Sequence, residues 1–169
     1  MGIPPQFRQN YDAVRDYCAQ MEENVRQGVG LLMTGTYGTL KTTFAVAALR
    51  AWIDSGHSGL LVPMCSLMDN LFTMRATNID EWAKYEYKLR RVSLLVLDDL
   101  GGENTDQSWV LSKVDSIVTE RYNRMLPIIA TTNLSPEEMK GTYSGRIIDR
   151  LRSVSKFMVF EGRSKRKSA

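Results

Sequence analysis

The residues best suited to chemistry lie together in one short loop, at positions 35–43. Gly35, Lys41 and Thr42 have the spacing of the phosphate-binding pattern G-x-x-x-x-G-K-[ST], and the loop lies between an apolar run and an alanine-rich segment. In such loops, backbone N–H groups and the start of the following helix converge on phosphate oxygens. We expect the lysine to reach the β- and γ-phosphates and the threonine hydroxyl to bind Mg²⁺. The predicted nucleotide-binding residues are Gly35, Thr36, Tyr37, Gly38, Thr39, Leu40, Lys41, Thr42 and Thr43.

One position of this loop departs from the pattern. The residue immediately before the lysine is Leu40, where the pattern has glycine. Glycine serves there because it accepts backbone conformations closed to residues with a Cβ atom and lets the backbone approach phosphate. A leucine is expected to strain the loop or to crowd the phosphate. Three interpretations stay open: weakened but real binding, a loop of altered shape, and a domain that has lost nucleotide binding.

Polar residues also follow two apolar runs further along the chain. Residues 94–97 lead into Asp98 and Asp99, and residues 128–131 lead toward Asn133. Ligands bind beyond the carboxyl ends of strands in a parallel α/β sheet, so these side chains are expected beside the phosphate loop. Asp98 is expected to hold Mg²⁺ and Asp99 to polarise an attacking water. Asn133 is expected to orient that water or touch the γ-phosphate, or else to serve as a turn residue. Together the three segments indicate a nucleotide hydrolase.

Strand and helix patterns alternate along the chain, which predicts a three-layer α/β fold. An amphipathic helix is expected first, because Tyr11, Val14, Cys18 and further apolar residues recur at spacings of three and four before Gly28. The expected strands are residues 30–34, 60–63, 94–97, 128–131 and 157–160. The expected helices are residues 42–54, 66–75 capped by Ser66, 80–91, 106–126 and 143–151, with one more starting at Ser135.

Length and composition limit the classes of protein that the chain can represent. Its 169 residues suit one domain, and 22 Lys and Arg against 19 Asp and Glu give a net charge of +3. Four of the positive charges lie in residues 163–169, so the rest is close to neutral and a wholly basic nucleic-acid coat is excluded. Two cysteines and one histidine exclude a disulfide framework and most zinc sites. No apolar run approaches a membrane span or a signal peptide, so we expect a cytoplasmic protein with no membrane partner.

These segments resemble the AAA+ ATPases, and among them the bacterial helicase loaders of the DnaC/DnaI type and the related IstB transposition helpers. The resemblance runs from residue 3 to residue 166. Its more specific parts are Leu97-Asp98-Asp99-Leu100-Gly101, Arg121-Tyr122-Asn123 followed by Leu126-Pro127, and Thr131-Thr132-Asn133-Leu134. The resemblance implies an α/β P-loop NTPase core with a five-stranded parallel sheet. It also implies ATP and Mg²⁺ as ligands, and self-assembly into a ring or spiral with nucleotide at the subunit interfaces.

The resemblance also assigns roles by position. Lys41 and Thr42 match Walker A, Asp98 and Asp99 match Walker B, and Asn133 matches sensor 1.

Three arginines are further candidates. Residues 145–151 resemble the segment that supplies an arginine finger to a neighbouring subunit, with Arg150 as first choice and Arg146 as second. A guanidinium suits that role because it stays charged and spreads its donors over phosphate oxygens, although both residues also fit a solvated helix surface. Arg166 matches either a second sensor or part of the basic tail.

The domain division follows from the same comparison of patterns. We expect an N-terminal extended segment and helix at 1–28, an AAA+ ATPase core at 29–162 and a basic tail at 163–169. The core starts almost at once, and no room is left after residue 162 for the helical lid of many AAA+ proteins. Either the chain is an excised domain, or its helicase contact lies elsewhere.

One helical segment has the composition of a surface for single-stranded DNA, which loaders of this family grip inside the ring. It mixes cations with aromatic side chains, as backbone-tracking stacking surfaces do. The same composition also describes a solvated amphipathic helix with Trp82 on its buried side. The residues are Lys84, Tyr85, Tyr87, Lys88, Arg90 and Arg91.

The predicted function is ATP-dependent loading of a replicative helicase onto single-stranded DNA, driven by ATP hydrolysis. Two alternatives stay open. One is an IstB-like transposition helper, which shares the fold and the chemistry. The other is an adaptor with impaired nucleotide binding, because Leu40 replaces the Walker A glycine.

Overall fold

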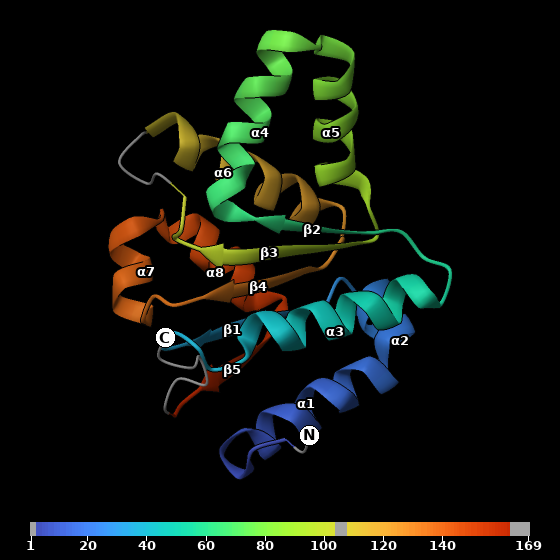
Figure 1. Cartoon of the computed structure of the whole chain (residues 1–169), viewed down its shortest axis with the longest axis vertical. Helices are drawn as coiled ribbons and strands as arrows, with labels where there is room; N and C mark the ends of the chain where they lie inside the picture. Colours follow the sequence, from blue (N-terminus) through green and yellow to red (C-terminus); the bar gives the residue numbers. More distant parts are fainter. Residues whose placement is uncertain (1–2, 104–107, 163–169) are drawn as a thin grey trace, which may run out of the picture.

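The computed structural model describes residues 3–103 and 108–162. Its strands form one five-stranded sheet in the order β2-β3-β4-β1-β5, and every neighbouring pair is parallel (Figure 1). This arrangement confirms the predicted α/β class and five-stranded parallel sheet. The strands are β1 (Gly30–Gly35), β2 (Gly59–Pro63), β3 (Leu94–Leu100), β4 (Ile128–Thr132) and β5 (Ser155–Phe160).

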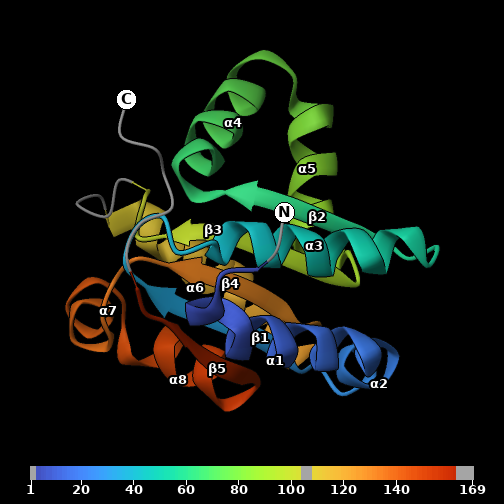
Figure 2. The same ribbon diagram turned by 60° about the horizontal axis from the view of Figure 1, so that its bottom comes forward.

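Helices cover both faces of the sheet, which gives the three predicted layers (Figures 1 and 2). The short 3-10 helix η1 (Pro5–Phe7) and helices α1 (Arg8–Ala19), α2 (Met21–Arg26) and α3 (Lys41–Asp54) lie on one face. Helices α6 (Ser108–Asn123) and α8 (Gly145–Ser153) lie on the other, with α7 (Pro136–Thr142) leading into α8.

The central strands are apolar on both sides because both of their faces are covered. Alternate residues of β3 enter different hydrophobic clusters: Leu95 and Leu97 pack on the α6–α8 side, while Leu94 and Val96 pack on the α1–α3 side. Phe7, from the N-terminal segment, is fully buried in the second cluster. Residues before β1 therefore share a core with the sheet.

Helices α4 (Met64–Thr77) and α5 (Ile79–Arg91) form a hairpin that rises from the β2 edge of the sheet (Figure 1). We call this unit the α4–α5 hairpin. Its inner side is tied to α6 by ion pairs: Glu86 contacts Lys113 at 2.5 Å, and Arg90 contacts Glu120 at 2.9 Å. The hairpin is therefore fixed at its base by both burial and charge.

Several predicted helix boundaries are wrong. The N-terminal helix is two helices, because the backbone leaves the helical region at Gln20. Helix α4 begins at Met64, so Ser66 lies within its first turn and does not cap it. Helix α6 ends at Asn123, because Met125 adopts a left-handed conformation, with φ of 55°, ahead of the next strand.

Other predicted signals are confirmed. Ser135 and Glu138 form a reciprocal capping box at the start of α7. Gly56 has φ of 87° just past α3, which is typical of a glycine that follows a helix. One further helix boundary is wrong: the helix predicted at 143–151 begins at Gly145, after its capping residue Ser144.

No helix within residues 3–103 and 108–162 is both long and apolar enough to cross a membrane. The predicted basic tail, including Arg166, lies outside the described residues.

Candidate nucleotide-binding site

The loop between β1 and α3 bends through three residues with positive φ. Gly35 has φ of 145°, and a Cβ atom there would lie 2.1 Å from the Phe160 carbonyl oxygen, so only glycine fits. Gly38 has φ of 74° and Leu40 has φ of 70°. The positions of the two glycines are therefore explained by the path of the loop.

Leu40 occupies the conformation for which glycine is normally selected. Its φ and ψ of 70° and 9° lie in the left-handed region, which costs a residue with a Cβ atom about 1–2 kcal/mol. The predicted strain is therefore present. The side chain is half-buried and packs against the hydrophobic cluster on the α1–α3 side, while the residue also lines the cavity described below. Core packing offsets part of the cost of the strained backbone.

The Lys41 side chain is 6% exposed and is held inside the loop. Its ammonium donates to the carbonyl oxygens of Gly35 at 2.7 Å and Thr36 at 2.8 Å, and to Asn133 Oδ1 at 2.9 Å. The predicted Walker A lysine and the predicted sensor asparagine are thus in direct contact, although 92 positions separate them in the sequence.

Asp98 lies at the end of β3 and accepts two hydroxyl hydrogen bonds. Thr42 Oγ1 donates to its Oδ1 at 2.8 Å, and Thr131 Oγ1 donates to the same oxygen at 2.7 Å. The two predicted Mg²⁺ ligands, Thr42 and Asp98, are therefore side by side. Sequence reasoning missed Thr131 as a site residue, although its place at a polar strand end was the signal that would have found it.

Asp99 is held in a left-handed conformation, with φ of 61°. Its N–H donates to Thr131 Oγ1 at 2.9 Å, and its carboxylate accepts a short hydrogen bond from Asn133 Nδ2. The pairing of β3 with β4 is irregular between Leu97 and Leu100, as is common where a strand end carries functional side chains. Asp99 therefore turns out of the sheet toward the phosphate loop.

These side chains surround a cavity of about 350 Å³ beyond the carboxyl ends of β1, β3 and β4. Of the predicted loop residues, Gly35 and Thr36 contribute carbonyl oxygens to Lys41 rather than lining the cavity. Tyr37 stands at its mouth and is 66% exposed. The lining residues are Tyr37, Gly38, Thr39, Leu40, Lys41, Thr42, Thr43, Asp98, Asp99, Thr131 and Asn133.

The chemistry of these donors fits a nucleoside triphosphate with Mg²⁺. Helix α3 begins at Lys41, so the N–H groups of its first turn have no partner within the helix, and the residues that carry them line the cavity. Such N–H groups suit an anion. Thr42 and Asp98 supply the oxygen ligands that Mg²⁺ prefers. Within the described residues there is no cluster of three His, Cys, Asp or Glu side chains that would hold a metal without phosphate oxygens.

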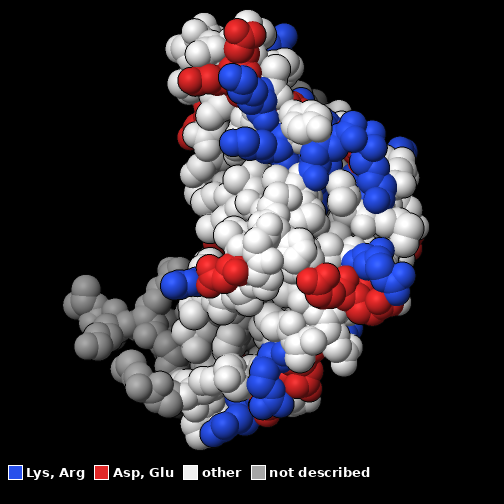
Figure 3. Space-filling view, turned by 90° about the vertical axis from the view of Figure 1, so that its right-hand side faces the viewer, with Lys and Arg blue, Asp and Glu red and all other residues white. Residues whose placement is uncertain are grey.

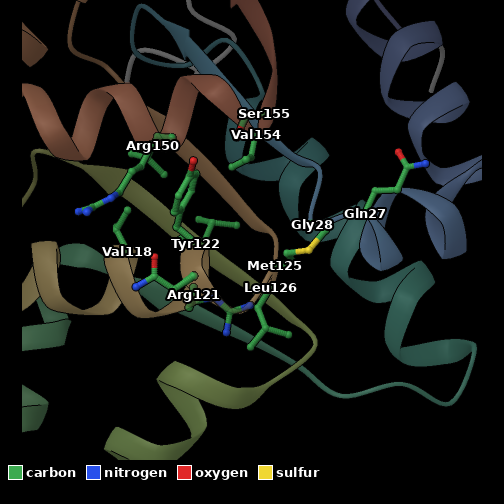
Figure 4. Close-up of a pocket in the computed structure, with 13 residues that line it drawn as sticks. Gln27, Gly28, Val118, Arg121, Tyr122, Met125, Leu126, Arg150, Val154 and Ser155 are labelled. Carbon is green, nitrogen blue, oxygen red and sulfur yellow. The ribbon is translucent and has the colours of Figure 1, made fainter.

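The two arginine-finger candidates do not line this cavity. Arg150 lines a different cavity, of about 410 Å³, where Figure 4 shows it beside Tyr122, with Met125 next to Gly28. Its guanidinium contacts Asp115 at 3.4 Å and Thr119, and its Cζ lies 5.8 Å from the centre of the Tyr122 ring.

Arg146 is exposed one turn earlier on α8. A finger role for either residue therefore requires a second copy of the chain.

The predicted DNA-contacting residues divide into two groups. Lys84, Tyr87, Lys88 and Arg91 are exposed, and Lys and Arg side chains gather on the upper half of the face that Figure 3 shows, where the α4–α5 hairpin lies. Two members of the set are only partly accessible to solvent. Tyr85 is half-buried against the hydrophobic cluster, and Arg90 is held between Glu86 and Glu120.

Comparisons with known proteins agree with this geometry. No protein-family model matches the chain. The replicative helicase loader DnaI of Bacillus subtilis is 29% identical over 142 residues, which cover 80% of this chain and 43% of that protein. The replicative helicase loader DnaC of Escherichia coli is 27% identical over 139 residues, which cover 82% and 55%. The chain thus spans about half the length of the curated relatives it matches.

Solved structures show the same fold. The crystal structure of the DnaC helicase loader has a TM-score of 0.80 at 24% identity, covering 95% of this chain and 93% of that one. Replication initiator DnaA bound to AMPPCP and single-stranded DNA has a TM-score of 0.76 at 17% identity, covering 95% and 48%. The predicted AAA+ fold and the resemblance to DnaC/DnaI-type helicase loaders are confirmed.

Proposed function

We propose that this chain is a helicase-loader ATPase, which binds and hydrolyses ATP with Mg²⁺ while placing a replicative helicase on single-stranded DNA. One observation supports the proposal: hydrogen bonds link all five predicted catalytic and metal-binding residues of the core around a single cavity, through side chains and the Asp99 N–H. Beginning at the metal side, the bonded series is Thr42, Asp98, Thr131, Asp99, Asn133 and Lys41.

The five predicted residues of this series each have a role that their contacts support. Lys41 exchanges its loop carbonyl partners for phosphate oxygens, because an ammonium is better satisfied by anionic acceptors. Thr42 and Asp98 would hold Mg²⁺, which would neutralise charge that develops on the phosphates. Asp99 accepts a proton from the attacking water. Asn133 contacts both Lys41 and Asp99, so it fixes the lysine relative to the base.

Assembly completes the site in this proposal. Arg150 points away from the cavity of its own chain and toward Asp115 and Tyr122. In a ring or spiral it reaches the nucleotide of the neighbouring copy, where an arginine stabilises the charge of the transition state. Arg146 is the second choice for the same role.

Single-stranded DNA binds the α4–α5 hairpin in this proposal. Its exposed cations and Tyr87 suit a phosphate backbone and stacked bases. A second aromatic and basic surface lies nearby, where Trp82 and Trp109 line a cavity of about 320 Å³ with Arg75 and Lys113. Fluorescence polarisation of a labelled oligonucleotide tests both surfaces. Lys88→Ala and Trp109→Ala should each weaken binding several-fold, whereas Arg26→Ala, on the exposed end of α2, should not.

Leu40 is the specific observation that favours the second candidate, a non-hydrolysing adaptor, because its strained backbone stands where phosphate binds. Phosphate release measured on the full chain separates the two functions. An active loader hydrolyses ATP, and Asp99→Asn abolishes the activity. An adaptor releases no phosphate in either form. Capture of a purified replicative helicase, compared with a purified transposase, separates the loader from an IstB-like helper.

A further inference from the structure

A buried carboxylate lies next to the candidate site, and the proposed chemistry does not use it. Glu103 is 5% exposed and follows the acidic end of β3 by three residues. Within the described residues it has no Lys or Arg in ion-pair contact, and two hydrogen bonds stabilise its carboxylate. Oε2 accepts from the Gly101 N–H at 2.8 Å, and Oε1 accepts a short hydrogen bond from the Tyr143 hydroxyl.

The first of these bonds holds the turn that contains Asp99. Gly102 donates its N–H to the Asp99 carbonyl oxygen at 2.8 Å, and Gly101 has φ of 97°. A Cβ atom on Gly101 would lie 2.6 Å from Leu134 Cδ1, so the turn is packed tightly against the segment that follows Asn133. A left-handed aspartate persists only where its surroundings hold it. Glu103 supplies one such restraint.

The second bond reaches the helix that carries the finger candidates. Tyr143 is 3% exposed and ends α7, and the next residue, Ser144, caps α8. Burial, followed by the charge of Glu103, raises the pKa of Tyr143, so its hydroxyl stays a donor. The Glu103 carboxylate, together with a direct hydrogen bond between Tyr143 and the Gly101 backbone, therefore joins the Asp99 turn to the first residues of α8, where Arg146 lies.

We propose that Glu103 and Tyr143 are positioning residues that couple the Asp99 turn to helix α8. This inference rests on the proposed ATPase function. A change at Asp99 when nucleotide binds shifts the Gly101 N–H, and Glu103 passes that shift to Tyr143 and the start of α8. The pair thus links occupancy of one nucleotide cavity to the helix that presents Arg146 and Arg150 to a neighbour.

Hydrogen–deuterium exchange on the full chain tests the coupling without requiring hydrolysis. The probe is AMPPCP with Mg²⁺, at a protein concentration where sedimentation shows a monomer. In the parent chain, we expect slower exchange both in loop 35–43 and in residues 144–153. In Tyr143→Phe, which keeps the ring and removes the hydroxyl, loop protection should persist. The extra protection that the nucleotide gives to residues 144–153 should fall about tenfold. This is the effect expected from losing one hydrogen bond to a charged group.

Glu103→Gln is the second variant and serves if Tyr143→Phe folds poorly. It too should keep the protection of loop 35–43 and lose protection of residues 144–153. Tyr85→Phe is the matched control, because it removes a half-buried tyrosine hydroxyl from the α4–α5 hairpin. It should leave both regions protected. If the nucleotide protects loop 35–43 of the parent chain but not residues 144–153, the coupling alone is overturned. The coupling is also overturned if both variants keep the full protection of residues 144–153. Absence of loop protection overturns the proposed function and the coupling together.

Discussion

Leu40 combines a strained backbone with a place in the lining of the candidate nucleotide-binding cavity. Because Leu40 lines the cavity and has a left-handed backbone, Leu40→Gly should let the loop approach phosphate more closely. We expect ATP affinity to rise roughly threefold to tenfold, which corresponds to about 0.7–1.4 kcal/mol of binding free energy. Leu40→Ala keeps the Cβ atom and should gain less. Equal affinities in the parent and Leu40→Gly would show that the strain does not affect binding.

The residues of the candidate site could be singled out from the sequence because their signals are local. The lysine and threonine follow from loop spacing, and the acids and the asparagine follow from their places at strand ends. The contacts of Thr131 could not be predicted, because they depend on how β3 and β4 pair across 33 positions. The bond between Glu103 and Tyr143 depends in the same way on tertiary packing.

Arg121 joins three secondary-structure elements from the centre of the molecule. It is fully buried on α6 and donates to the carbonyl oxygens of Leu89 at 3.2 Å, at the end of α5, and Pro127 at 2.9 Å, before β4. Burial lowers its pKa to about 10, so the guanidinium remains charged near neutral pH.

Arg121→Met removes the Arg121 donor from both carbonyl oxygens and leaves that of Pro127 with only the longer bond from the Leu95 N–H, at 3.4 Å. We expect the free energy of unfolding to fall by about 1–3 kcal/mol. Urea denaturation followed by circular dichroism measures the change. Arg124→Met is the control, because Arg124 is exposed at the end of the same helix and should matter by less than about 0.5 kcal/mol. If Arg121→Met is as stable as the parent chain, apolar packing of the methionine compensates for the lost hydrogen bonds to Leu89 and Pro127.

Tyr17 connects α1 to Val29, the residue before β1, by a hydrogen bond. Its hydroxyl donates to the Val29 carbonyl oxygen at 2.8 Å, and burial raises its pKa above the usual value of 10. As pH rises, the Tyr17 hydroxyl loses its proton in the unfolded chain before it does so in the folded chain. Its contribution to the free energy of unfolding is therefore complete below about pH 10 and is lost above it. The stability difference between the parent and Tyr17→Phe should therefore shrink between pH 9 and pH 11. A constant difference would contradict that linkage.

Helix ends were harder to predict than helices. The α6 terminus at Asn123 depends on a left-handed Met125, whose conformation no residue type signals. The α4 start at Met64 follows directly from the β2 strand, whereas serine at position 66 suggested a cap two residues later. Strand order also requires knowledge of which strands pair, which no local pattern contains.

The whole molecule presents its nucleotide cavity and its finger candidates on different surfaces. If active sites form between copies, Lys41→Ala and Arg150→Ala should each lose ATP hydrolysis, while an equal mixture recovers roughly a quarter of the parent rate. Recovery follows because some interfaces in the mixture combine an intact lysine with an intact arginine. Arg152→Ala, on the same helix, is the control and should keep its activity. No recovery in the mixture would argue that each chain acts alone.

Nucleotide binding by the loop is the premise on which assembly and helicase loading rest. Titration of a fluorescent ATP analogue with Mg²⁺ into the parent chain and Lys41→Ala measures it directly. We predict saturable binding by the parent chain, weaker binding when Mg²⁺ is chelated, and loss of about 100-fold or more in Lys41→Ala, since a phosphate contact to a charged group is removed from a buried site. Absence of saturation in the parent chain at millimolar nucleotide, or equal binding by Lys41→Ala, would contradict the proposed site.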